Sequence, residues 1–286
     1  MVKNVIGYYK VEPKERAYFA VRLIISLLIY IGLATYLVMN TNDSNVTIFL
    51  VIIVYTLGFI MVVWLRNGFL IGLIKANSVK INQKQLPEIY QLVEKYSENL
   101  GLRKIPSIYL LESGGILNAF ATKMFSKHTI VIFAELLEDF YNGNEETIEF
   151  VIAHELGHIK RKHLAKEWYL FPSNLFFFIT LAYSRACEYT CDNIGQSLSA
   201  KGAIKGILTL SGGKKLQSKI DAQEYIRQIK SDRSFWRWLV EKLSTHPNLN
   251  KRLAKVYDQT VPQQTVKPVE TPTIISNDDH SRYMPL

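Results

Sequence analysis

The sequence predicts a mainly helical fold with a small β-sheet (α+β), preceded by a hairpin of two transmembrane helices. Two uncharged segments near the start of the chain, 23–39 and 47–65, hold 17 and 19 residues. Each approaches the ~20 apolar residues with which a helix crosses a bilayer. Beyond residue 86 the apolar residues recur mostly at helical spacing, and only two short runs are typical of strands.

The composition limits the classes of function that the chain can have. Its 286 residues, 48% of them hydrophobic, are enough for one sizeable folded domain beyond the hairpin. The net charge of +9 comes without an aromatic-rich basic motif, so we expect anionic lipid headgroups, and not nucleic acid, as its partner. The two cysteines, Cys187 and Cys191, are too few for a disulfide scaffold. We expect reduced thiols on a helix, with a metal or redox role as the alternative.

The hairpin is expected over residues 1–75, with helices at about 20–39 and 47–65. The first apolar segment is long for a signal peptide, lacks a small-x-small cleavage site and is followed at once by the second. The connection 40–46 contains one acidic residue and no Lys or Arg, whereas both outer flanks are basic. The positive-inside rule therefore predicts a multi-pass protein of the cell membrane, with its N-terminus and the following domain in the cytoplasm.

A cytosolic domain is expected over residues 76–258. Strand-like runs occur at 107–111 and 129–133. After residue 258 the chain is rich in Pro, Thr, Gln and Ser, so we expect 259–286 to be a disordered tail. Helical spacing of apolar residues recurs in five segments, which are 87–100, 145–164, 184–198, 201–230 and 234–257.

The run VIAHELGHIKRKHL at 151–164, in the second of these segments, has a chemical meaning. On a helix, His154 and His158 share one face and can point two imidazoles at one ion. Glu155 lies about 100° round the helix, which suits a base that reaches a water held by the metal. Gly157 removes a side chain, so that another element can approach. A charged helix with solvated histidines is the alternative, but the apolar residues before His154 favour a buried first histidine.

A catalytic zinc commonly has three protein ligands and one open position. Glu188 and Asp192 share a face of the predicted helix 184–198. Glu188 would complete a site of two histidines and one carboxylate, while Asp192 could orient a ligand histidine from behind. An acidic, solvated helix face is the alternative. The remaining residues of this helix are mostly small or apolar, which favours the metal site.

Three motifs now stand in order along the chain: HExxH at 154–158, SRACEYTCD at 184–192 and STHP at 244–247. Together they resemble the HtpX-type membrane metallopeptidases, whose eukaryotic relatives include the CAAX prenyl protease. The resemblance covers roughly residues 70–257. It implies a zincin-like metalloprotease domain with one Zn²⁺ per chain.

The resemblance also implies a role for individual residues. The zinc ligands would be His154, His158 and Glu188, and Glu155 would be the catalytic base. Asp192 remains the residue that orients a ligand.

Two further assignments rest on the resemblance alone. His246 would lie near the reacting carbonyl, and Asn118 would sit on an edge strand that holds the substrate backbone. Without the resemblance, His246 is a loop histidine and Asn118 a turn residue. The other three histidines match no motif, and we expect them at the surface; they are His128, His163 and His280.

A further apolar patch at 168–183 contains 16 uncharged residues. Its two flanks hold ligands of one ion, so the chain must return to the side from which it left. At 1.5 Å per residue, 16 helical residues reach only ~24 Å against a ~30 Å apolar core. We therefore predict a helix pair or short hairpin that dips into the cytoplasmic leaflet or packs beside the first two spans. A buried core helix is the alternative.

These observations predict an integral-membrane zinc endopeptidase that cleaves membrane-associated proteins or peptides, in membrane-protein quality control or peptide processing. A catalytically inactive, zinc-containing membrane scaffold is the alternative, but structural zinc needs no base such as Glu155. An intramembrane protease is a third possibility. It would need the HExxH helix inside the bilayer, and the basic residues at 160–162 argue against that position.

Overall fold

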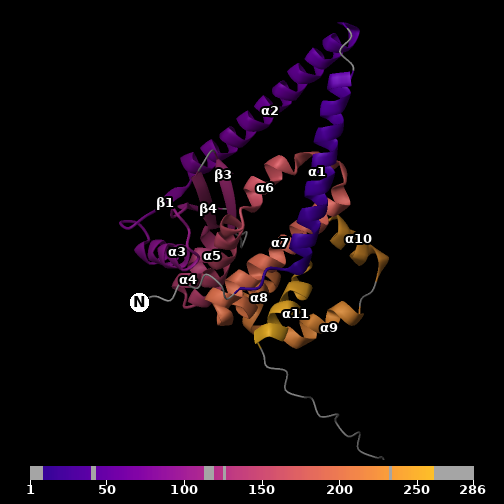
Figure 1. Ribbon diagram of the computed structural model, residues 1–286. Helices are drawn as coiled ribbons and strands as arrows, with labels where there is room; N and C mark the ends of the chain where they lie inside the picture. The colour runs from indigo at the N-terminus through magenta and orange to yellow at the C-terminus, as the bar shows by residue number, and fades with distance from the viewer. Residues whose placement is uncertain (1–8, 40–42, 113–118, 125–126, 232–233, 261–286) are drawn as a thin grey trace, which may run out of the picture.

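The computed structural model describes residues 9–39, 43–112, 119–124, 127–231 and 234–260. Two long helices, α1 (Pro13–Met39) and α2 (Asp43–Asn77), extend from a mainly helical domain that contains a small sheet (Figure 1). Among the described helices, these two are long and apolar enough to cross a membrane. Both exceed the predicted bounds, because isolated charged residues such as Arg66 do not end a helix.

The two long helices meet at one end and diverge toward the domain (Figure 1). α1 packs against the middle of the chain, at α7 (Phe177–Leu198) and the 3-10 helix η1 (Phe171–Leu175). α2 instead reaches the sheet, at two of its strands. The domain is thus held between the two halves of the hairpin.

The described strands form one sheet in the order β1-β2-β4-β3. β2 and β4 are parallel, with Ile108 opposite Ile130, and the other two pairs are antiparallel. The predicted runs correspond to β2 and β4, whereas the three-residue β1 is too short to show a pattern. β3 is the outer strand next to β4. The strands are β1 (Val79–Ile81), β2 (Ser107–Leu111), β3 (Ala119–Met124) and β4 (Lys127–Phe133).

Helix α5 (Glu145–Lys160) runs through the centre of the domain. Its side chains are buried on almost every face, because α4 (Ala134–Tyr141), α7 and α8 (Ala200–Leu216) pack around it. The ring of Phe150 packs against Gly195 of α7 and Gly206 of α8. The remaining helices are α3 (Pro87–Asn99), α6 (His163–Tyr169), η2 (Gln217–Lys219), α9 (Ala222–Ser231), α10 (Phe235–Leu243) and α11 (Leu249–Thr260).

The predicted helix 145–164 is in fact two helices. Lys162 adopts a left-handed conformation with φ of 55°, which ends α5 and starts α6 in a new direction. The chain then passes through η1 and returns along α7. The apolar patch 168–183 therefore consists of the end of α6, η1 and the first turns of α7.

This patch packs against α1 on one side and exposes aromatic residues on the other. Leu170, Tyr183 and Cys187 form a small buried cluster with apolar residues of α1. Phe171 also contacts Phe59 of α2, with ring centroids 6.5 Å apart. The exposed large apolar side chains of the patch are Trp168, Tyr169, Phe171, Leu175, Phe176, Phe177 and Phe178.

Candidate metal centre

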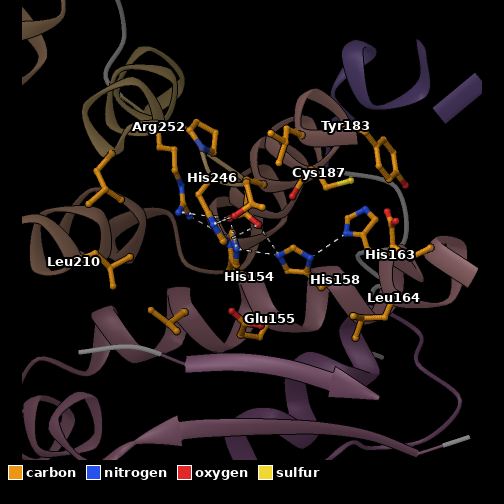
Figure 2. A pocket seen from close by; sticks show the side chains of 18 of the residues that line it. His154, Glu155, His158, His163, Leu164, Tyr183, Cys187, Leu210, His246 and Arg252 are labelled. Atoms are coloured by element: carbon orange, nitrogen blue, oxygen red, sulfur yellow. Dashed lines mark hydrogen bonds and ion pairs between the residues drawn. The ribbon is translucent and has the colours of Figure 1, made fainter. Parts of the chain in front are cut away.

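Helices α5 and α7 pack against each other and bring three predicted ligands to one point. Figure 2 shows the two histidines of α5 next to each other. The Nε2 atoms of His154 and His158 are 3.3 Å apart. Glu188 extends one carboxylate oxygen to each of them, at 3.4 Å from His154 and 3.3 Å from His158. His154 and Glu188 are buried, and His158 is partly buried.

These distances agree with a single zinc ion. A tetrahedral ion with bonds of about 2.0–2.1 Å separates its ligand atoms by about 3.3–3.4 Å. The three separations fall in this range, with a different oxygen of Glu188 facing each histidine. Two imidazoles and one carboxylate are a donor set that catalytic zinc uses. The residues present therefore fit the metal that the motif implies.

Asp192 contacts the first histidine from behind, one turn after Glu188 on α7. Its Oδ1 lies 3.0 Å from Nδ1 of His154, so the histidine can donate from Nδ1 while Nε2 faces the metal position. The guanidinium of Arg252, on α11, donates to both carboxylate oxygens of Asp192, at 2.8 and 2.6 Å. Arg252 also lies 3.6 Å from Glu188, so this buried cation compensates both carboxylates.

The charges around the candidate ligands favour a positively charged His154 and an ionised Glu188. Burial alone would lower the pKa of His154, but hydrogen bonds to Asp192 and Glu188 raise it to about 10. Burial would likewise raise the pKa of Glu188, yet the two histidines hold it well below its usual range. A cation is thus favoured where the metal would bind.

Glu155 is buried in the wall of a cavity of about 720 Å³ that also contains the three ligands. Figure 2 shows its side chain between the histidines and the strands of the sheet. Helix α5 thus supplies two candidate metal ligands and a carboxylate beside them.

His246 lies in the loop between α10 and α11, at the edge of the same cavity. Its Nε2 is 3.5 Å from Oε1 of Glu188, and its side chain is 65% exposed. Arg185 of α7 holds this loop, because its guanidinium donates to the carbonyls of Lys242 and Ser244 at 2.9 and 2.7 Å. The remaining predicted site residue, Asn118, lies outside the described residues.

The expectation that His163 lies at the surface is wrong. The turn at Lys162 folds α6 back, and His163 becomes buried between α5, α7 and α1. Its Nδ1 is 3.1 Å from Nδ1 of His158, and its Nε2 is 3.3 Å from Oε1 of Glu15. Burial is the largest influence on His163, and its pKa falls to about 4. His128 is partly buried on β4, and His280 lies outside the described residues.

Sequence reasoning also missed Arg252. A signal existed, since Arg252, Leu253 and Val256 are spaced to share the buried side of α11, so a cation stands among apolar positions. Its partner could not be read from the sequence, because Asp192 is sixty positions away. The two cysteines are free and buried, and burial raises the pKa of both thiols, in agreement with the reduced state expected.

Comparison with known proteins adds an independent observation. The model of peptidase family M48 matches residues 83–179 and 170–260. Proteins described as protease HtpX homologues are similar over shorter segments. One from Campylobacter curvus is 37% identical over 84 residues, which are 29% of this chain and 28% of the relative. One from Tropheryma whipplei is 30% identical over 116 residues, or 41% of this chain and 38% of the relative.

A third relative, from a Sulfurovum species, is 43% identical over 72 residues, a quarter of each chain. The chain thus matches well under half the length of these curated relatives. No solved structure matches. The family model, however, covers well over half of the 286 residues and includes every predicted ligand. The chain therefore belongs to peptidase family M48.

Proposed function

We propose that this protein is an integral-membrane, zinc-dependent endopeptidase. The observation that carries the proposal is the convergence of His154, His158 and Glu188 at separations of 3.3–3.4 Å, in a cavity that Glu155 also lines. A structural zinc has four protein ligands and needs no carboxylate base. Three ligands with a carboxylate nearby therefore support a catalytic site over an inactive scaffold.

Bound zinc would supply a Lewis acid and lower the pKa of a coordinated water toward ~7. Glu155 would accept a proton from the attacking water and pass it to the leaving amine. Asp192 would keep His154 in the tautomer that presents Nε2 to the metal. Arg252 would keep Asp192 and Glu188 ionised in their buried surroundings.

His246 is suited to stabilise the oxygen on which negative charge develops. Its imidazole can donate a hydrogen bond from a loop that Arg185 fixes, and exposure leaves it free to meet a substrate. As part of the same proposal, Asn118 would help to hold the substrate backbone. Asn118 directly precedes β3, the outer strand of the sheet, and an extended peptide can add to such a strand through its backbone.

The membrane would lie close to this site. α1 and α2 suit transmembrane spans, and the exposed aromatic residues at 168–183 suit a segment that enters the cytoplasmic leaflet. We therefore propose substrates that are membrane proteins, their exposed loops or membrane-associated peptides. Such substrates would fit a role in membrane-protein quality control or peptide processing.

The test uses the full-length protein purified in detergent. We expect one zinc per chain by elemental analysis and cleavage of casein that stops on addition of a chelator and returns with zinc. The ligand variant His158→Ala should lose both metal and cleavage. Zinc retention without cleavage of casein or any membrane-protein substrate would favour the scaffold instead.

A further inference from the structure

We propose that His163 and Glu15 form a hydrogen-bond relay that orients His158, and that helix α1 thereby supplies part of the metal centre. The proposal rests on the zinc site proposed above and extends it to the first membrane helix. His163 and Glu15 would be positioning residues, and neither would bind the metal.

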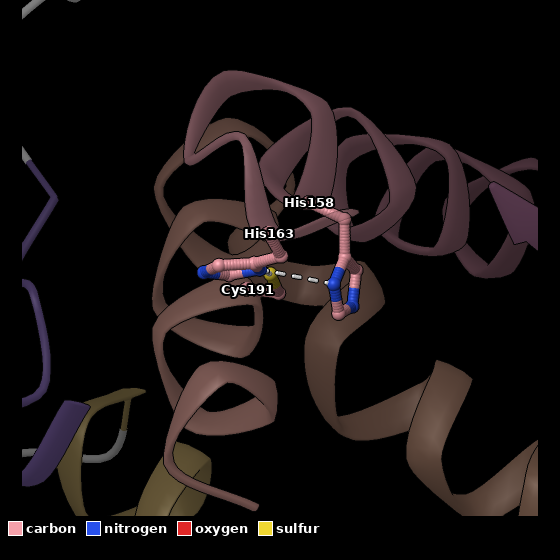
Figure 3. A group of neighbouring side chains, drawn as sticks. All are labelled: His158, His163 and Cys191. Atoms are coloured by element: carbon pink, nitrogen blue, oxygen red, sulfur yellow. Dashed lines mark hydrogen bonds between the residues drawn. The ribbon is translucent and has the colours of Figure 1, made fainter. Parts of the chain in front are cut away.

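The geometry is a line of three groups from three helices. Nε2 of His158 faces the other ligands, and its Nδ1 lies 3.1 Å from Nδ1 of His163 (Figure 3). Nε2 of His163 lies 3.3 Å from Oε1 of Glu15, in the first turn of α1. His163 and Glu15 are both buried, so water does not compete freely for these bonds.

Only one arrangement of protons satisfies this line. A histidine that binds a metal through Nε2 carries its proton on Nδ1. His158 must therefore donate to His163, which accepts at Nδ1 and keeps its own proton on Nε2. That second proton points to Glu15, whose ionised carboxylate accepts it. Each atom has the role that its neighbour requires.

The surroundings of Glu15 stabilise its ionised carboxylate. The guanidinium of Arg161 donates two hydrogen bonds to its Oε1, at 3.2 and 2.8 Å, and Lys166 lies 3.8 Å away. Charged partners on α5–α6 therefore stabilise a carboxylate that α1 brings in. The result parallels the other ligand: Asp192 orients His154 directly, and Glu15 orients His158 through one intervening imidazole.

A second metal ion is the competing explanation of the same cluster. His158, His163 and Cys191 lie close enough together to hold one, as do Glu15, His163 and Cys187. Figure 3 shows the first of these groups. In the relay, however, Nδ1 of His163 accepts from His158 and Nε2 carries a proton, so neither nitrogen can bind a second metal. The two explanations therefore exclude each other.

The experiment measures zinc affinity by competition with a chelator in the full-length protein. His163→Phe removes both the acceptor and the donor and should weaken zinc binding about 10–100-fold. His163→Gln retains one acceptor and one donor and should restore affinity to within about threefold of the native protein. Glu15→Gln removes the charge at the outer end and should weaken binding, though less than His163→Phe.

Glu12→Gln is the matched control. Glu12 stands three residues before Glu15, and its carboxylate also pairs with a cation of the domain, Lys255. Its backbone carbonyl accepts a hydrogen bond from the amide of Glu15, and Glu12→Gln leaves that bond in place. Its affinity should stay within about twofold of native. Unfolding temperatures of the metal-free variants identify any that misfold; if His163→Phe does so, Glu15→Gln against Glu12→Gln decides.

Unchanged affinity in His163→Phe or in Glu15→Gln would overturn the relay. Two zinc ions per native chain, reduced to one by His163→Phe, would also overturn it, in favour of a second metal site. A native protein that binds no zinc would refute the proposed function itself, which is a different result from either of these.

Discussion

Glu155 tests the proposed chemistry at the scale of one residue. Glu155→Gln keeps the size of the side chain and removes its ability to take a proton. Because Glu155 is not among the three converging ligands, zinc content should stay at one per chain, while turnover of casein should fall about 10²–10⁴-fold. Normal turnover by this variant would refute the role of Glu155 as base.

The proton on His154 gives a second prediction. Its pKa is raised to about 10, so at pH 8 the metal-free site still holds that proton, and zinc must displace it. Zinc affinity should therefore rise with pH, by about tenfold per unit between pH 8 and 9, and level off above about 10. Calorimetry in buffers of different ionisation enthalpy should detect about one proton released at pH 8. No release at this pH would show that Asp192 and Glu188 do not raise the pKa of His154.

The site residues that could be predicted are those that helix periodicity places on one face, whereas the others depend on how the helices dock. His154, Glu155 and His158 are fixed by the geometry of one helix, and Glu188 needed only a second helix with a suitable face. Arg252 and His163 depend on the docking of α11 and on a turn at Lys162. No periodicity encodes those contacts, so the sequence identifies neither the partner of Arg252 nor the burial of His163.

At the scale of elements, the position of α5 depends on how closely α8 can approach it. A Cβ added at Gly202 would lie 2.0 Å from the carbonyl oxygen of Glu146, and backbone cannot move aside as a side chain can. Gly202→Ala should therefore destabilise the protein by about 1–3 kcal/mol, although alanine is the better helix former. Thermal unfolding measures the effect.

Gly72→Ala provides the control for this change. Gly72 is also helical, and a Cβ there would meet nothing within 4 Å. This variant should unfold at or above the native temperature. If Gly202→Ala were equally harmless, the close contact between α5 and α8 would not limit stability.

The elements themselves were partly predictable. The apolar spacing and the strand-like runs located α5, α7, β2 and β4, because each has a strong periodic or β-branched pattern. The boundaries were less accurate: α7 begins at Phe177, seven residues before the predicted start. An apolar segment such as 168–183 has the same composition in a helix, a 3-10 turn or a membrane segment, so packing on α1 decides its form.

At the scale of the molecule, α1 joins the two-helix hairpin to the M48 domain. Arg22 is fully buried in the contact, and its guanidinium binds both oxygens of Glu167, at 2.7 and 2.9 Å, as well as Ser173 and Asn174. Seven residues earlier, Glu15 contacts His163, which in turn contacts His158. The segment between the two helices that carry the candidate ligands is thus held against α1. In the proposed topology, this contact places the metal centre near the membrane.

Because α1 is attached to the domain, the side of the membrane on which the domain lies can be predicted and tested. The charge pattern predicts that the connection between α1 and α2 faces outward, and α1 then holds the domain on the cytoplasmic side. A membrane-impermeant maleimide added to intact cells should label Ser44→Cys, whereas Asp221→Cys, on the surface of the domain, should react only after lysis. The native cysteines are buried and should contribute little background. Phe177→Cys should stay unlabelled from outside, since 168–183 is too short to cross the bilayer and return. Outward labelling at residue 177 would contradict a shared cytoplasmic side for the patch and the metal centre.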